Sequence, residues 1–355
     1  MTDKQTQKAG NNSRLIQVET VIVGVDEKRV REVIDEKLNI ALQNFTSEAA
    51  NEAKNRAEKF NKSLIQRMVQ ENALTAFSDP SFQILLIEAQ KRAASTEREP
   101  DYNLLSELMV HRFKKGSNRI VRAGISRAVE IVDQISSEAL LGITVFHSAS
   151  YFAPIASDMA QGLKILDDLF GKIIYDVLPT NTEWLDHLDV LDAVRITSFG
   201  NTKLFEDYWG ERFNEYLKKG IEENSEKHNE AKLILKDSKL GENCLVKDVF
   251  NEKYLKLNVL DKNQISQLVI TNSLKQSRPL TIDEKSALEK VYDLYDGTKM
   301  SREDFIKVID GYPNIKKLRE WWNTLNHQSI QITSVGRVLA HSNAQRVDKS
   351  LPPLN

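Results

Sequence analysis

Hydrophobic residues recur along most of the chain with the spacing that amphipathic helices show. Residues 27–76 contain no glycine or proline, and their apolar positions repeat every three or four residues. This spacing places them on one face of a helix, which another element must cover. We favour a single unbroken helix, about 75 Å long at 1.5 Å per residue, over a hairpin of two shorter helices. The apolar positions are Ile34, Leu38, Ala41, Phe45, Ala49, Ala53, Ala57, Phe60, Leu64 and Met68.

The segment before this stripe has a different pattern. Residues 15–25 read LIQVETVIVGV and are rich in β-branched side chains, which predicts one or two short strands. An isolated hairpin is marginally stable in water, and the next hundred residues offer no strand-like partner. We therefore expect the segment to pair with its counterpart in another copy of the chain, giving a homo-oligomer. The expected oligomerisation residues are Ile16, Val18, Val21, Ile22, Val23, Leu38 and Phe45.

Capping signals and strand-like runs organise the rest of the chain. Asp79 followed by Pro80 is typical of a helix start, and helices are expected from there to about Leu235. Thr180 to Glu183 and Thr281 to Glu284 each have the spacing of a capping box. Two short strands are expected at 244–246 and 254–259, and Asp261 is expected to cap a helix to residue 274.

Residues 279–343 resemble a winged-helix module. Three short predicted helices precede a strand-like run at 329–333 and a final helix at 334–341. The last helix carries a Thr-x-x-Gly-x-x-Leu pattern beginning at Thr333, a pattern common after the wing of such domains. Many winged helices contact protein, so we expect a protein-contacting or capping module, with nucleic acid as the alternative partner.

These patterns predict a mainly α chain, a helical bundle with a short N-terminal β segment and a small β-containing insert near 244–259. The C-terminal part is expected to be winged-helix-like. The expected divisions are a polar arm and β-prone oligomerisation segment (1–25), a long amphipathic helix or helical hairpin (26–78), a helical core (79–240), a small α/β segment and linker (241–278), the winged-helix-like module (279–343) and a tail (344–355).

The composition agrees with a helical globular chain. The 355 residues are 41% hydrophobic and include only 14 Gly and 8 Pro, whereas β-rich folds need frequent turn residues. A net charge of −2 gives no general attraction to nucleic acid or to membranes. The single cysteine, Cys244, excludes an internal disulfide and a multi-cysteine metal site. No apolar run is long enough to span a bilayer and no secretory signal is visible, so we expect a cytoplasmic location.

Signals for catalysis or metal binding are weak. The chain contains none of the common zinc-protease, nucleophile-elbow, P-loop or dinucleotide-binding motifs. The densest group of possible metal ligands is Asp186, His187 and Asp189, since carboxylates suit divalent cations. We favour a simpler interpretation, in which acidic residues begin a helix where its dipole stabilises negative charge. We expect no cofactor and no catalytic residue, although a site assembled from distant residues stays open.

Positive charge is concentrated in residues 111–127, which carry six Lys and Arg residues and no acidic residue. Clustered cations can bind phosphates, because neutralising a polyanion releases its counterions. A face that forms salt bridges with acidic helices is the favoured alternative. The candidate nucleic-acid-binding residues are Arg112, Lys115, Arg119 and Arg122 in this stripe and Lys316, Lys317 and Arg319 in the C-terminal module.

Motifs at both ends resemble a known family. The opening Gly10-Asn-Asn-Ser is followed by Ile16-Gln, and the chain closes with Ile332-Thr-Ser-Val-Gly336; Asp79 to Gln83 also matches. Together they resemble bacterial proteins of unknown function that are known by Legionella and Veillonella locus names, although Asn11 stands where Asp is usual. The resemblance implies no catalytic residue, and its functional content is an association with bacterial stress or phage defence.

The sequence therefore predicts a non-enzymatic, self-associating cytoplasmic protein that acts as a scaffold, sensor or regulator. The alternative is a nucleic-acid-binding regulator that uses the basic stripe and the winged-helix-like module.

Overall fold

The structure is a computed structural model that describes residues 26–43, 46–116, 118–154, 156, 158–197, 200–248, 250–259, 261–271 and 277–354. It confirms the mainly α fold class, with 66% of the described residues helical and a few short strands. The predicted β-prone segment, with Ile16, Val18, Val21, Ile22 and Val23, lies outside the described residues, as does Phe45. Among the described helices, none is both long and apolar enough to cross a membrane.

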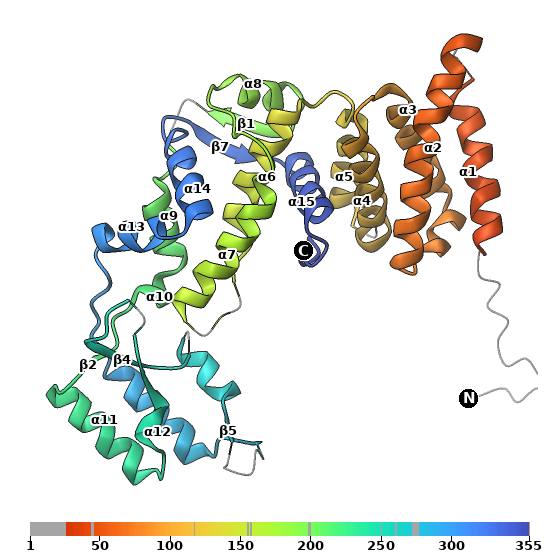
Figure 1. The fold of residues 1–355 in the computed structure, drawn as a ribbon. Coiled ribbons are helices and arrows are strands. Elements are labelled where there is room, and N and C mark those ends of the chain that lie inside the picture. Colours follow the sequence, from red (N-terminus) through yellow and green to blue (C-terminus); the bar gives the residue numbers. More distant parts are fainter. Residues whose placement is uncertain are drawn as a thin grey trace, which may run out of the picture.

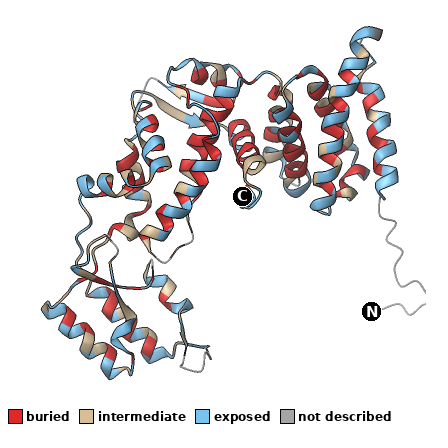
Figure 2. Cartoon of the chain, in the orientation of Figure 1, coloured by how far each residue is buried: buried red, intermediate tan, exposed pale blue. Residues whose placement is uncertain are grey.

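The first half of the molecule is a row of helices, seen across the upper right of Figure 1. Each helix packs on the next through a buried apolar face, which Figure 2 shows in red. The elements are α1 (Glu27–Ala41), α2 (Ser47–Gln70), a short 3-10 helix η1 (Leu74–Ser78), α3 (Pro80–Ser95), α4 (Glu99–Lys115) and α5 (Arg119–Ile131).

The second half continues the same hydrophobic core. Two distant segments, β1 (Val194–Thr197) and β7 (Ser329–Ile332), pair antiparallel with Val194 opposite Ile332. The helices are α6 (Ser137–Tyr151), α7 (Met159–Ile173), α8 (Glu183–Val190), α9 (Phe205–Arg212), α10 (Asn214–Leu217), α13 (Arg302–Asp310), α14 (Pro313–Asn323) and α15 (Ser334–Val347).

Two helices replace the single long helix that we favoured for residues 27–76. α1 ends at Ala41 and α2 begins at Ser47, so the alternative of two shorter helices is the observed one. Both pack against α3, and the Gln90 amide of α3 donates to the Ile34 carbonyl of α1 and to Asn61 of α2. α3 is only 16 residues long, about 24 Å, and would cover a third of an unbroken helix. The break therefore lets the stripe be buried on both helices, except at the exposed Ala49 among its described positions.

A second, smaller unit has its own core. Its central sheet has the order β2-β4-β3, and α11 and α12 pack together beside it. The unit lies at the lower left of Figure 1. Its elements are β2 (Ile221–Glu222), α11 (Glu226–Asp237), a 3-10 helix η2 (Glu242–Cys244), β3 (Leu245–Lys247), β4 (Tyr254–Leu257), a 3-10 helix η3 (Lys262–Gln267), β5 (Val269–Thr271), β6 (Ser277–Pro279) and α12 (Ile282–Asp293).

This unit is inserted between α10 and α13 by two chain segments that run side by side. The amide of Lys219 donates to the carbonyl of Thr298 at 3.0 Å, and that of Met300 donates to Leu217 at 2.9 Å. The amide of Asp296 donates to the carbonyl of Gly220 at 3.1 Å. The predicted boundaries at 240 and 278 do not coincide with this grouping, because the second core draws on residues from Ile221 to Tyr292.

The segment 279–343 is divided between the two cores. α12 packs in the second core, whereas α13, α14 and α15 contribute to the main core. β7 pairs with β1, more than a hundred residues earlier, rather than with a strand of its own segment. The winged-helix comparison is therefore unconfirmed, since the apolar faces of these elements find partners elsewhere in the chain.

Local signals have mixed outcomes. The capping box at Thr281 is present in full, and Asp79 caps α3 as expected. The capping box predicted at Thr180 is wrong. The N-cap residue of α8 is Thr182, directly before Glu183, and its side chain makes no capping hydrogen bond. Asp261 does cap a helix, but it is the short η3, and β5 follows where we expected the helix to continue.

The start of α15 fits tightly against the turn before β1. The Thr333 hydroxyl donates to the carbonyl of Asp192 at 2.6 Å and accepts from the amide of Gly336 at 3.2 Å. A Cβ atom on Gly336 would lie 1.9 Å from the carbonyl oxygen of Ala193. Glycine is therefore required here by a close approach of two backbones.

We expect Gly336→Ala to lower the free energy of unfolding of the main core by about 2 kcal/mol or more, because the added methyl group must displace backbone. All four tryptophans lie in the main core, so urea unfolding followed by tryptophan fluorescence measures this unit. Gly297→Ala is the matched control, since a Cβ there would meet nothing within 4 Å. Equal stability of the two variants would contradict the packing at Gly336.

Candidate functional site

The group of possible metal ligands on α8 does not converge. Asp186 is exposed, and Nε2 of His187 lies 3.2 Å from both the amide of Ser136 and the carbonyl of Gln134. Asp189 lies 3.7 Å from Arg195. Within the described part of the chain, no cluster of three or more His, Cys, Asp or Glu side chains could hold a metal ion. The imidazole of His187 therefore links α8 to the chain before α6.

About half of the basic stripe is used in ion pairs. The guanidinium of Arg112 is buried and lies 3.5 Å from Asp79. Lys114 pairs with Glu71 at 2.6 Å, and Arg127 pairs with Glu130 at 3.0 Å. These contacts fit the interpretation of a salt-bridged face.

Three cations of the stripe remain without a carboxylate partner among the residues that the structure places. They are Lys115 at the end of α4 and Arg119 and Arg122 at the start of α5. Lys115 and Arg122 are half-buried, and Arg119 is exposed. They form the only cluster of predicted nucleic-acid-binding residues in the described chain that is not neutralised by acidic neighbours.

The second candidate set lies on α14 and is less available. Arg319 forms a two-point contact with Asp310, at 2.8 and 2.9 Å. Lys316 lies 4.0 Å from Glu320, whereas Lys317 is exposed and has no ion pair within the described residues. The structure thus leaves one free cation of the three on this helix.

Leu38 is already buried within the chain. It is 4% exposed and packs with Ala53 and Ala57 of α2 and Ala94 of α3. Its apolar surface is therefore covered without a second copy. Of the predicted oligomerisation residues, it is the one that the structure describes.

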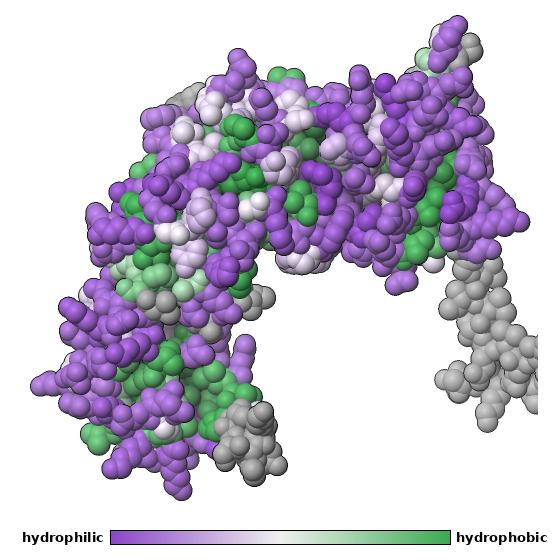
Figure 3. All heavy atoms as spheres, viewed as in Figure 1, coloured by the Kyte–Doolittle hydropathy of each residue, from purple (hydrophilic) through white to green (hydrophobic). Residues whose placement is uncertain are grey.

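An open groove lies between α1 and α2, near the start of the described chain. Ile34, Ile65 and Val69 line it, with charged and amide side chains at its rim. Val69 remains 44% exposed. Figure 3 shows a hydrophobic strip in this region of the molecule. α1 packs mainly on α3, which leaves this side of α2 uncovered.

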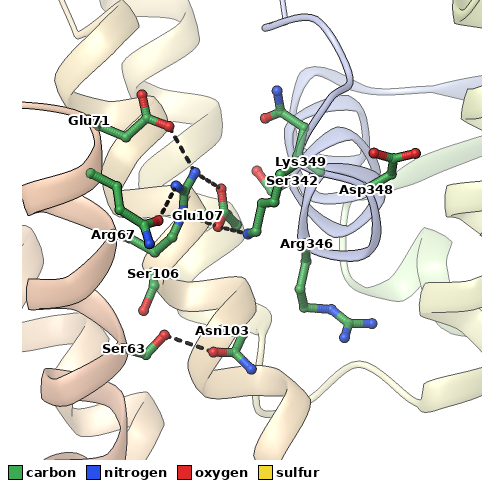
Figure 4. A network of polar contacts seen from close by, with 12 residues as sticks. Ser63, Arg67, Glu71, Asn103, Ser106, Glu107, Ser342, Arg346, Asp348 and Lys349 are labelled. Carbon is green, nitrogen blue, oxygen red and sulfur yellow. Dashed lines mark hydrogen bonds and ion pairs between the residues drawn. The ribbon is translucent and has the colours of Figure 1, made fainter.

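A buried carboxylate joins the first row of helices to the end of the chain. Glu107 on α4 is 2% exposed and accepts from Arg67 Nε on α2 at 2.6 Å. Lys349, just after α15, also pairs with Glu107, and Arg67 reaches Glu71 at 3.0 Å. Figure 4 shows these side chains converging from three segments. A hydrogen bond with the Glu107 carboxylate raises the pKa of Arg67, which favours the charged guanidinium.

Three buried histidines lie beside this network. His111 on α4, His147 on α6 and His341 on α15 are each at most 4% exposed. The ring centroids of His147 and His341 are 5.4 Å apart, and those of His111 and His341 are 5.7 Å apart. The cluster therefore sits where α15 meets the two halves of the main core.

The hydrogen-bond partners suit neutral rings. His341 Nε2 donates to the Pro352 carbonyl at 2.9 Å, and in the neutral ring Nδ1 accepts from His147 Nε2 at 3.2 Å. His111 Nε2 donates to the side-chain carbonyl of Gln345 at 2.7 Å, and its Nδ1 accepts from the Ser342 hydroxyl at 3.0 Å. Both sets of hydrogen bonds involve α15 or the tail that follows it.

Burial disfavours the charged form of these rings. It lowers the pKa of His147 to about 3 and that of His341 to about 4. His341 and Arg337 act in the same direction on the pKa of His147, and His111 does so on that of His341. Burial also lowers the pKa of His111. These three histidines were not singled out from the sequence. The only signal in the sequence is a polar residue at a helix position that faces the hydrophobic core.

We expect the free energy of unfolding to fall as the pH is lowered from 7 to 5. The unfolded chain binds protons on histidine near pH 6.5 and the folded chain does not, so each ring with a folded pKa of about 4 or below costs about 2 kcal/mol at pH 5. Urea unfolding at several pH values should show a shallower decline for His147→Gln and for His341→Gln. His327→Gln, at an exposed position, is the control, and an unchanged decline in the first two variants would contradict this assignment.

No curated protein and no solved structure matches the chain. A family model named after a Veillonella locus tag matches residues 24–352, almost the whole of the described chain. The match includes Asp79 to Gln83 and the closing Ile332–Gly336 motif, whose Gly336 has a structural role, and it begins after the opening at Gly10. The chain therefore belongs to this family of unknown function.

Proposed function

We propose that this chain is a non-enzymatic, self-associating protein that acts as a scaffold, sensor or regulator in the cytoplasm. The observation that carries the proposal is the open groove between α1 and α2, in which Val69 is exposed and Ile65 is half-buried. In the sequence, the β-prone residues 15–25 immediately precede Asp26 and α1, one of the two helices that form the groove. The family resemblance supports a role in stress or phage defence.

The buried polar groups support binding rather than chemistry. Glu107 is engaged by Arg67 and Lys349, and the three buried histidines are all held in hydrogen bonds. Burial raises the pKa of the Cys244 thiol, which disfavours the reactive thiolate. A nucleophile and a base that face a common cavity are not found among the described residues.

We expect the full chain to elute as an oligomer in size-exclusion chromatography with light scattering, and residues 26–355 to elute as a monomer. Val69→Glu should weaken association, because it places a charge in the apolar groove. Val190→Glu, on α8, is the matched control at an exposed valine far along the chain. A full chain that is monomeric at every concentration would rule the proposal out.

A second candidate function is nucleic-acid binding, which the unpaired cations Lys115, Arg119 and Arg122 favour. Clustered cations without carboxylate partners can contact phosphates at a low cost, because no existing ion pair has to be broken. The cluster spans the junction of two helices that are fixed by the main core.

We expect Arg119→Glu combined with Arg122→Glu to abolish any salt-sensitive retention of duplex DNA or RNA in a filter-binding assay. Lys316→Glu combined with Arg319→Glu is the comparison, since Arg319 is already paired with Asp310. If the wild-type chain retains no nucleic acid at low salt, this second function falls and the first is unaffected.

A further inference from the structure

Two adjoining hollows lie where the inserted unit meets the main helical part. Their volumes are about 220 and 290 Å³, and together they reach the size of small-molecule sites. The larger hollow is bordered by α10 and α13 on one side and by β4 on the other. The side chains common to both hollows are Met159, Tyr216, Asp248, Phe250 and Lys256.

Lysines outnumber acidic residues around the larger hollow. Its lining includes four lysines and two aspartates. Lys307 pairs with Asp304 at 3.0 Å, and Lys256 pairs with Asp248. The remaining cations are Lys218, which reaches back to Glu215 at 2.6 Å, and Lys219.

Lys219 adds positive charge to this lining and acts on the carboxylates of Asp296 and Asp304 only by longer-range attraction. It has no ion pair with a carboxylate of the described chain, and its Nζ lies 5.6 Å from the centroid of the Tyr254 ring. It belongs to the connector segment, where its amide is fixed by the Thr298 carbonyl. The position of this positive charge is therefore set by the backbone that joins the two units.

Aromatic rings complete the lining. Tyr216, Phe250 and Tyr254 are each half-buried and border the larger hollow, so each keeps part of its surface in the open space. Aromatic side chains beside lysines are typical of nucleotide-binding sites. There the lysines bind the phosphates and an aromatic ring stacks on the base. An apolar ligand would give the Lys219 ammonium no direct ion pair, whereas an anionic ligand would supply one.

We propose that this groove binds a small anionic ligand with both a phosphate and a planar ring, of the nucleoside diphosphate class. Lys219 contacts the phosphates, with Lys307 at the opposite border, and Tyr254 offers a ring for the base. The ligand touches α10 and α13 of the main part, β4 of the inserted unit and the connector between them. Its binding therefore restrains the two units relative to each other, which suits a sensor.

The test is isothermal titration calorimetry of the full chain with ADP, GDP, CDP and UDP, with adenosine and inorganic pyrophosphate as partial ligands. We expect at least one nucleoside diphosphate to bind, and both partial ligands to bind at least tenfold more weakly than it. Lys219→Ala and Tyr254→Ala should each weaken binding tenfold or more. Lys290→Ala is the control, at an exposed lysine of α12 without an ion pair in the described chain.

Lys307→Ala is the second cation variant, because its exposed side chain leaves folding intact. The proposal is overturned if none of the four nucleotides binds at millimolar concentration, or if Lys219→Ala and Lys307→Ala bind as the wild-type chain does. It is also overturned if pyrophosphate alone binds as tightly as the nucleotide. None of these outcomes depends on the oligomeric state, so this test is independent of the proposed assembly.

Discussion

The packing of the last helix against helices from both halves of the chain holds the main core together. α15 contacts α4 and α5 on one side and α6 on the other. Its inner face is not purely apolar, since His341, Ser342 and Asn343 are fully buried. Buried polar groups must be hydrogen-bonded to be tolerated, and here each of them has a partner on α4, on α6 or in the tail. These hydrogen bonds therefore specify the position of α15 against its neighbours.

This arrangement explains why the end of the chain is ordered. The tail after α15 supplies the Pro352 carbonyl to His341 and the Lys349 ammonium to Glu107, and Leu354 is buried in the main core. Without the tail, a buried carboxylate and a buried imidazole would each lose a partner. Contacts made by the last residues thus determine whether α2, α4 and α15 can stay together. The inserted unit does not take part in this packing and depends on its own core and its two connectors.

Charge along the sequence was a poor guide to charge in space. The stripe at 111–127 contains no acidic residue, yet Arg112 and Lys114 find Asp79 and Glu71 on neighbouring helices. Glu107 has no cation within three or four residues that could have indicated its role, because Arg67 and Lys349 come from distant segments. Side-chain partners of this kind are chosen by helix packing, which a single sequence does not display.

Periodicity and composition were enough to determine that the chain is mainly helical, and capping residues such as Asp79 and Thr281 marked where helices begin. These features act over three or four residues, so they can be recognised without knowing the fold. The tertiary structure alone decided that residues 27–76 break into two helices, that β7 pairs with β1, and that α12 joins a different core from α13. The physical reason is that an apolar face or a strand edge specifies only that it must be covered. Which segment covers it depends on the packing of the whole chain.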